Sequence, residues 1–299
     1  MCVVHICTFK GASAVSLLDN ELFVLKKPSS KQLDVYDATD YSPRGCVTIP
    51  AGSSFVDMAA CCFNHCLYLP DVLNDRIVKL QLPGMLSEWK VDDIGSDPTV
   101  SVTSSHYLLV VCDDTFGQKG KLKLFSTDGR LQTTVFLQQD IVNVNSAVEL
   151  SPGQYVVTHG RESDNLHRVC VVNSGGKIIN VHGGFKGSHP KLLDTPMGVV
   201  IDKDGFVCVV DAKNRRLTVL CSKQDYIHCV NDGFPTKVYP CTKERGKYDW
   251  PLPTEQITFS SLFCTRIKID KLLQHVYLNC EVHTFNGSIE NYDVRIYKI

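Results

Sequence analysis

Three polar residues, Asp211, Asn214 and Arg216, lie in a short loop between two strongly apolar segments. A carboxylate, an amide and a guanidinium at this spacing could grip a polar ligand or take part in catalysis. They could equally hold the loop itself. An aspartate at a strand end accepts backbone N–H groups, an asparagine tolerates the left-handed conformation of tight loops, and an arginine can bind the carboxylate or loop carbonyls. Both interpretations are open for a single loop.

The same spacing recurs at Asp71, Asn74 and Arg76, again between two apolar and β-branched segments. A pattern that is repeated along a chain is better explained as a brace of each repeating unit than as one catalytic centre. The structural interpretation is therefore favoured for both loops. The neighbouring cations Lys213 and Arg215 are better candidates for contact with a ligand or partner.

Weaker copies of the strand–loop–strand pattern fill the rest of the chain, and no segment shows a sustained helical apolar period. Regular repeats of about four short strands are typical of a radial array of sheets. The predicted units span residues 12–50, 55–91, 99–137, 144–183, 196–231 and 262–299, with an insertion at 232–260.

The last of these units supplies three strands before the chain stops. We expect residues 1–9 to provide its fourth strand, because pairing the two ends in one sheet closes a ring and removes open sheet edges. The predicted fold is therefore all-β: a single six-bladed β-propeller of four-stranded blades, closed by the N-terminal strand. Five or seven blades are the alternatives.

The repeat around the 211–216 loop resembles an NHL repeat, carried here by Pro196, Gly198, Asp202, Gly205, Val209, Asp211, Asn214 and Arg216. The motif is strong in this unit and weaker at residues 55–82. The resemblance implies a propeller like the C-terminal domains of tripartite-motif/NHL proteins, in which the propeller recognises partners while other segments build a ubiquitin ligase. No zinc-ligand array or heptad run occurs in this sequence. The resemblance therefore implies either the substrate-recognition part of such a ligase or a stand-alone relative.

The insertion at 232–260 is rich in proline, aromatic and basic residues. Long loops within compact domains are often functional, and tyrosine, tryptophan and arginine are frequent in binding hot spots. We therefore predict a protein-binding face. Its contact residues are predicted to be Lys26, Lys27, Lys213, Arg215, Tyr239, Lys243, Arg245, Lys247, Tyr248 and Trp250.

An RNA-hairpin-binding propeller is one alternative function. The net charge of the chain is −1, and the charges of the loops on the predicted binding face nearly cancel. Phosphate recognition needs a continuous positive track, so protein recognition is favoured over RNA.

A metal-dependent propeller enzyme of the lyase or lactonase type is the other alternative. On the strands expected to line the channel, the only charges expected to face the interior are Asp57, Glu149 and Arg266. Three such residues are too few for a ligand set. The group around Cys61 places Cys62 and Cys66 on one strand face and Cys61 and His65 on the other, which argues against zinc. We expect no catalytic site, cofactor or metal.

The opening residues lack a charged and a long apolar region, and no segment approaches the length of a membrane span. Most of the fourteen cysteines fall in apolar segments. These features predict a cytoplasmic protein with free thiols and no membrane partner.

Overall fold

The computed structural model describes residues 4–26, 31–112, 120–189, 191–202, 205–220, 227–231, 262–270, 275–283 and 289–298. Regular structure in these ranges consists of β-strands. None of the described segments forms a helix long and apolar enough to cross a membrane.

Within the described ranges, the strands form six four-stranded antiparallel sheets. Sheet 1 contains β2 (Ala12–Leu18), β3 (Glu21–Lys26), β4 (Gln32–Asp37) and β5 (Pro43–Thr48). Sheet 2 contains β6 (Ala59–Cys61), β7 (Cys66–Asp71), β8 (Arg76–Gln81) and β9 (Met85–Lys90). Sheet 3 contains β10 (Thr99–Val102), β11 (Leu108–Cys112), β12 (Lys121–Phe125) and β13 (Leu131–Phe136).

Sheet 4 contains β14 (Val144–Ser151), β15 (Gln154–His159), β16 (Leu166–Asn173) and β17 (Ile178–Phe185). Sheet 5 contains β18 (Pro196–Ile201), β19 (Val207–Asp211), β20 (Arg216–Leu220) and β21 (Ile227–Asn231). Sheet 6 joins the two ends of the chain, because β1 (Val4–Lys10) pairs with β24 (Ile289–Lys298), beside β23 (His275–His283) and β22 (Leu262–Asp270).

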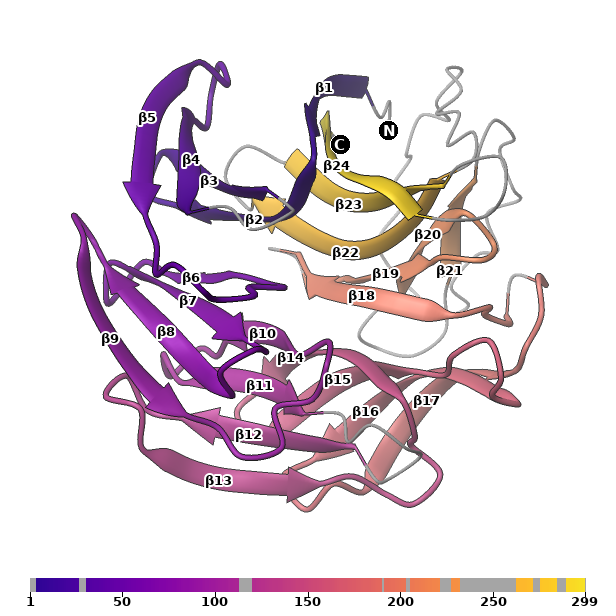
Figure 1. The fold of residues 1–299 in the computed structure, drawn as a ribbon. Helices are drawn as coiled ribbons and strands as arrows, with labels where there is room; N and C mark the ends of the chain where they lie inside the picture. Colours follow the sequence, from indigo (N-terminus) through magenta and orange to yellow (C-terminus); the bar gives the residue numbers. More distant parts are fainter. Residues whose placement is uncertain are drawn as a thin grey trace.

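The first strands of the sheets contact one another in chain order, from β2 through β6, β10, β14 and β18 to β22, and β22 contacts β2. Figure 1 shows the consequence: the first strands lie toward the middle of the molecule, while β5, β9, β13 and β17 lie along its outer edge. The prediction of an all-β propeller with four-stranded blades is confirmed.

An apolar layer fills each space between neighbouring sheets for which side chains are described. The layer between sheets 1 and 2 includes Phe23, Leu67 and Leu80. Similar layers lie between sheets 2 and 3, 3 and 4, and 4 and 5. Ile296 of sheet 6 is fully buried against the other face of sheet 1.

The inner strands are buried on both faces, since each blade is covered on two sides. Side chains alternate along a strand, so Leu67 and Leu69 of β7 face sheet 1, whereas Cys66 and Tyr68 face sheet 3. This explains why these strands are uninterrupted apolar runs, and why the sequence lacks the simple alternation of a half-exposed sheet.

Antiparallel order gives the ring two different faces. The hairpin face carries the turns between first and second strands and between third and fourth strands. The loop face carries the loops between second and third strands, together with the links from one sheet to the next. Lys26, at the end of β3, and the predicted contact loop at 211–216 both lie on the loop face.

Candidate functional site

One buried carboxylate holds the loop between β7 and β8. Asp71 ends β7, and its Oδ1 accepts a hydrogen bond at 2.8 Å from the N–H of Ser54, in the link that leads into β6. Its Oδ2 accepts from Asn74 Nδ2 at 2.7 Å and from Arg76 Nε at 2.9 Å. The Arg76 side chain is 19% exposed and also binds Glu88. The loop is thereby tied to the chain that enters the same sheet.

The loop between β19 and β20 has the same frame in a more buried form. Asp211 accepts from the Asp194 N–H at 2.7 Å, from Asn214 Nδ2 at 2.8 Å and from Arg216 Nε at 2.6 Å. The Arg216 side chain is only 4% exposed. Its remaining donors reach the backbone carbonyls of Ser188, His189 and Leu192.

Sheet 4 contains a variant in which a histidine stands where the other two loops have an aspartate. His159 ends β15, and its Nε2 accepts a hydrogen bond at 3.0 Å from Arg168 Nε. Burial, and then the charge of Arg168, lower the pKa of His159 from 6.5 to about 4, so the ring is neutral at pH 7. Arg168 also donates at 2.9 Å to Asp140, in the link into this sheet.

In the 71–76 and 211–216 loops, the frame binds the buried aspartate to the arginine, and the residue just before the arginine stays exposed. Arg215 is exposed, and its backbone has a φ of 51°. Asp75 occupies the same loop position in sheet 2 with a φ of 49° and is also exposed. The same backbone frame therefore displays opposite charges in sheets 5 and 2.

Around Arg215, the loop face of sheets 4 and 5 gathers four exposed cations, the partly exposed Lys213 and one aromatic ring. We call this surface the sheet 4–5 patch; it consists of Arg161, Phe185, Lys186, Lys191, Lys213 and Arg215. Hydrogen bonds bring its segments together: Asn214 Nδ2 donates to the Gly187 carbonyl at 2.9 Å, and the Lys186 N–H donates to the Asn165 carbonyl at 3.3 Å.

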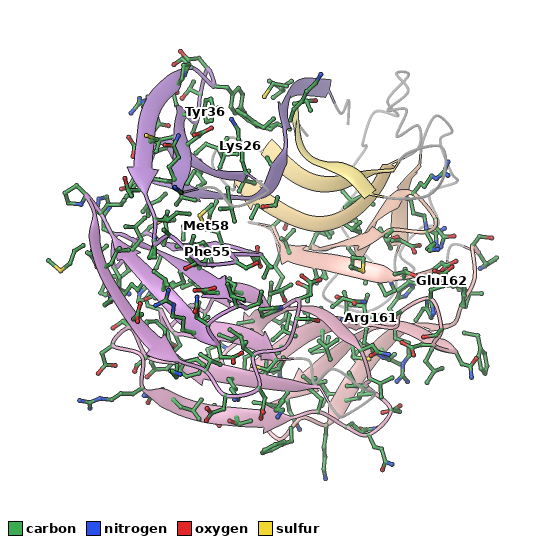
Figure 2. All side chains as sticks on the ribbon, viewed as in Figure 1. Lys26, Tyr36, Phe55, Met58, Arg161 and Glu162 are labelled. Carbon is green, nitrogen blue, oxygen red and sulfur yellow. The ribbon has the colours of Figure 1, made fainter. Side chains whose placement is uncertain are left out.

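Glu162 lies among the cations of this patch. Its Oε1 is 2.7 Å from Lys213 Nζ, although the carboxylate side chain is 72% exposed. The hydrogen bond from Lys213, and then the charges of Lys213 and Lys186, lower the pKa of Glu162. Figure 2 shows Arg161 and Glu162 beside each other on this side of the ring. The cations here are thus arranged so that they bind a carboxylate.

The aromatic member of the patch is Phe185, at the end of β17, which is 73% exposed. It pairs with Leu166 across the sheet and directly precedes Lys186. Other large apolar side chains, such as Phe63 and Phe136, are exposed to a similar extent, but an aromatic ring beside cations is the combination that binding hot spots use.

The structure places only part of the predicted contact set at this surface. Lys213 and Arg215 belong to it. Lys26 lies on sheet 1, where its Nζ is 2.5 Å from Asp34 Oδ2, well apart from Arg161 and Glu162 in Figure 2. The other predicted contact residues lie outside the described residues; they are Lys27, Tyr239, Lys243, Arg245, Lys247, Tyr248 and Trp250.

Four members of the patch were not predicted: Arg161, Phe185, Lys186 and Lys191. Within the loop at 160–168 the charges cancel, because Glu162 and Asp164 offset Arg161 and Arg168. Charge summed over the loops between second and third strands leaves out the link from β17 to β18, which carries Lys186 and Lys191. Charge summed over neighbouring loops and links together would have indicated this surface.

Gly160 sets the course of the loop that carries Arg161. Its φ is 106°, and a Cβ at this position would lie 2.3 Å from the Leu166 carbonyl oxygen. We expect Gly160→Ala to lower the free energy of unfolding by about 2 kcal/mol more than Gly153→Ala. Gly153 is the matched control, because its φ is also positive, at 77°, but its nearest neighbour would be 3.8 Å away. Urea denaturation followed by circular dichroism measures the difference, and equal losses would contradict the close approach.

The charged residues predicted for the inner strands bind neighbouring sheets. Asp57 Oδ2 accepts from the Val100 N–H at 2.9 Å, joining sheets 2 and 3. Glu149 accepts from the N–H and the hydroxyl of Ser104, each at 2.7 Å, joining sheets 4 and 3. The side chain of Arg266 lies outside the described side chains. Asp57 and Glu149 therefore hold the ring together.

The cysteine group of sheet 2 differs from the predicted arrangement. Cys61 and Cys66 pair across β6 and β7 and are both buried, whereas Cys62 is exposed. The prediction that Cys62 and Cys66 share a face was wrong, because residues 62–65 form the turn and the alternation of a strand does not continue through it. His65 Nδ1 lies 2.8 Å from Asp19 of sheet 1. Across the part of the chain that the structure describes, no three His, Cys, Asp or Glu side chains gather as a metal site would require.

The fold and this surface together define a β-propeller with four-stranded blades, braced loops and a charged loop face. No protein-family model matches the chain, and no curated protein matches it either. The NHL resemblance therefore stays a prediction.

Solved structures with the same architecture have diverse functions. The chain is similar to virginiamycin B lyase from Staphylococcus aureus, with 9% identity and a TM-score of 0.59, covering 99% of both chains. It is similar to the Cps50 (Swd1) β-propeller domain of Myceliophteria thermophila, with 9% identity, a TM-score of 0.57 and coverage of 98% and 100%. Hydrazine synthase of Kuenenia stuttgartiensis matches with 12% identity and a TM-score of 0.61, covering 96% of this chain and 86% of that one. At these identities the likeness shows the propeller fold.

Proposed function

We propose that this protein is a recognition module without catalytic activity, which binds a protein partner through the loop face of a closed, six-bladed ring. The sheet 4–5 patch is the observation that supports it most directly. The patch combines an exposed phenylalanine with cations on a rigid frame, and rigid aromatic and cationic side chains supply most of the binding energy in protein interfaces.

The arrangement of the inner polar residues supports binding over catalysis. Asp57 and Glu149 accept hydrogen bonds from the neighbouring sheet, and Asn145 Nδ2 donates to the carbonyls of Gly160 and Pro196 at 3.2 and 2.9 Å. These groups stabilise contacts between blades. By contrast, the patch presents cations and an aromatic ring to solvent, and these groups suit the binding of a partner.

The charge pattern of the loop face supports a protein partner over RNA. Sheets 2 and 3 display four exposed aspartates on this face, Asp75, Asp92, Asp93 and Asp97, of which Asp93 is paired with Lys121 at 2.8 Å. A nucleic acid bound to the sheet 4–5 patch would meet this acidic sector as it crossed the ring, whereas a protein segment can end within the patch.

The NHL resemblance supports a more particular form of the proposal. In that form the propeller selects substrates for a ubiquitin ligase in the cytoplasm, as the C-terminal propellers of tripartite-motif/NHL proteins do. The apolar layers between sheets provide the rigidity that such a platform needs.

Affinity capture with the tagged, full chain tests the proposal. We expect the double variant Lys213→Glu/Arg215→Glu to recover at least about tenfold less of the partners that the wild-type chain retains from a cell extract, since charge reversal opposes a complementary surface. Quantitative mass spectrometry measures the recovery.

The matched control is the double variant Arg130→Glu/Lys177→Glu, which makes the same change of charge on the hairpin face, where both side chains are exposed. It is expected to retain the same partners as the wild type. Equal recovery by the wild type and the Lys213/Arg215 variant would disprove binding through this face.

A further inference from the structure

We propose that the sheet 4–5 patch binds an acidic segment of its partner, which places carboxylates on the cations and a large apolar side chain against Phe185. This inference rests on the proposed function and specifies its ligand chemistry. Four observations support it: the position of Glu162, the exposure of Arg215, the exposed ring of Phe185 and the acidic sector of the same face.

Glu162 already shows how the patch receives a carboxylate. Its side chain is held by Lys213 at 2.7 Å, and the charge of Lys186 acts on it as well. The side chain is nevertheless 72% exposed, so the ion pair lies in water and contributes little to folding. A partner carboxylate can therefore replace Glu162 at Lys213 at small cost.

Arg215 supplies a second anchoring point for a carboxylate. Within the described part of the chain its guanidinium forms no hydrogen bond or ion pair, and the side chain is exposed. The loop beneath it is fixed, because the Arg215 N–H donates to the Ala212 carbonyl at 3.0 Å and Arg216 binds Asp211. A guanidinium on a fixed loop can bind a carboxylate through two parallel hydrogen bonds with little further ordering.

Phe185 gives the patch an apolar contact beside these charges. The ring is 73% exposed, and the adjacent Lys186 side chain is 40% exposed. Covering such a ring with an apolar side chain removes a large apolar area from water. The patch is therefore suited to a segment that carries both carboxylates and a bulky apolar residue.

The distribution of charge limits the partner to a short segment. The acidic sector of sheets 2 and 3 lies on the same face and, even with Asp93 paired to Lys121, offers an extended polyanion no continuous positive track, which disfavours nucleic acid. It also gives the segment one favoured location, since the corresponding loop of sheet 2 carries Leu73 and Asp75 where sheet 5 has Lys213 and Arg215.

The test uses the full chain and a fluorescein-labelled synthetic peptide of glutamates around a central leucine, with binding followed by fluorescence anisotropy at low ionic strength. We expect saturable binding that weakens as salt screens the charges. Peptides with glutamine in place of glutamate, or glycine in place of leucine, are expected to bind at least about tenfold more weakly.

Protein variants identify the surface. Arg215→Glu and Phe185→Ala are each expected to weaken peptide binding about tenfold. Glu162→Gln is expected to strengthen it about threefold, because it removes the internal competitor for Lys213. The controls are Arg130→Glu, for charge, and Phe63→Ala, whose ring is 74% exposed on the hairpin face; neither is expected to change binding.

Several outcomes would overturn the inference: no peptide binding at low salt, unchanged binding by the Arg215 and Phe185 variants, or tighter binding of a single-stranded RNA of equal net charge. Self-association of the chain that the Arg215 variant abolishes would also overturn it, by assigning the patch to a second copy. If partner capture depends on Lys213 and Arg215 while the acidic peptide fails, only this inference falls. If capture is independent of them, the proposed function falls too.

Discussion

Replacing Asp211 with asparagine is expected to lower the free energy of unfolding by about 3–5 kcal/mol, because the change leaves a buried guanidinium without its counter-charge. The Arg216 side chain is 4% exposed, and its only anionic partner among the described residues is Asp211, at 2.6 Å. Its other hydrogen bonds go to backbone carbonyls, which carry no formal charge to offset it. Unfolding by guanidinium chloride, followed by circular dichroism, measures the loss.

Asp71→Asn is the matched control, since it makes the same change in the same motif. The Arg76 side chain is 19% exposed and binds Glu88 as well as Asp71, so it keeps an anionic partner after the substitution. We expect a smaller loss, of about 1–2 kcal/mol. Equal losses for the two variants would show that burial of the arginine does not set the strength of the frame.

Acidification from pH 6.5 to pH 4 is expected to lower the free energy of unfolding by about 3 kcal/mol for each of His159 and His182. Burial lowers the pKa of each histidine from 6.5 to about 4, helped by Arg168 for His159 and by Arg216 and Lys191 for His182. The unfolded chain therefore takes up protons first as the pH falls. The stabilisation that comes from keeping these histidines neutral is fully present above pH 6.5 and is lost as the pH falls from 6.5 to about 4.

Urea unfolding at a series of pH values measures this loss. His159→Gln keeps a hydrogen-bond acceptor for Arg168 but does not titrate, so it is expected to remove about half of the dependence between pH 6.5 and 4. The carboxylates whose pKa is lowered, such as Asp140, act at lower pH and do not imitate this effect. An unchanged slope in the His159 variant would rule out this histidine as the source.

The fold was predictable because each strand carries its own signal. Runs such as Cys66 to Leu69 are apolar at every position, as required of a strand that is covered on both sides, and they recur at nearly constant spacing. The frames of the loops were predictable as well. The groups of each motif lie within six residues of one another, so local chemistry alone suggests that Asp211, Asn214 and Arg216 bind one another.

Only two of the six patch members were predictable, because the members come from three separate segments. Lys213 and Arg215 stand beside a recognisable motif, whereas Phe185 and Lys186 reach them through the link that Arg216 and Asn214 bind. The position of Lys26 shows the same difficulty. Its partner Asp34 is a diagonal neighbour across β3 and β4, and that register is not visible in the order of residues.

The repeated frame of the 71–76 and 211–216 loops separates what holds a loop from what the loop displays. Positions 213 and 215 of one loop, and 73 and 75 of the other, can change from cation to anion to leucine while the buried acid and arginine stay the same. If the loop face binds a partner as proposed, mutation at such positions would alter specificity with little risk to folding. A new ligand preference is therefore accessible through one or two substitutions, and related chains that share this ring need share no ligand.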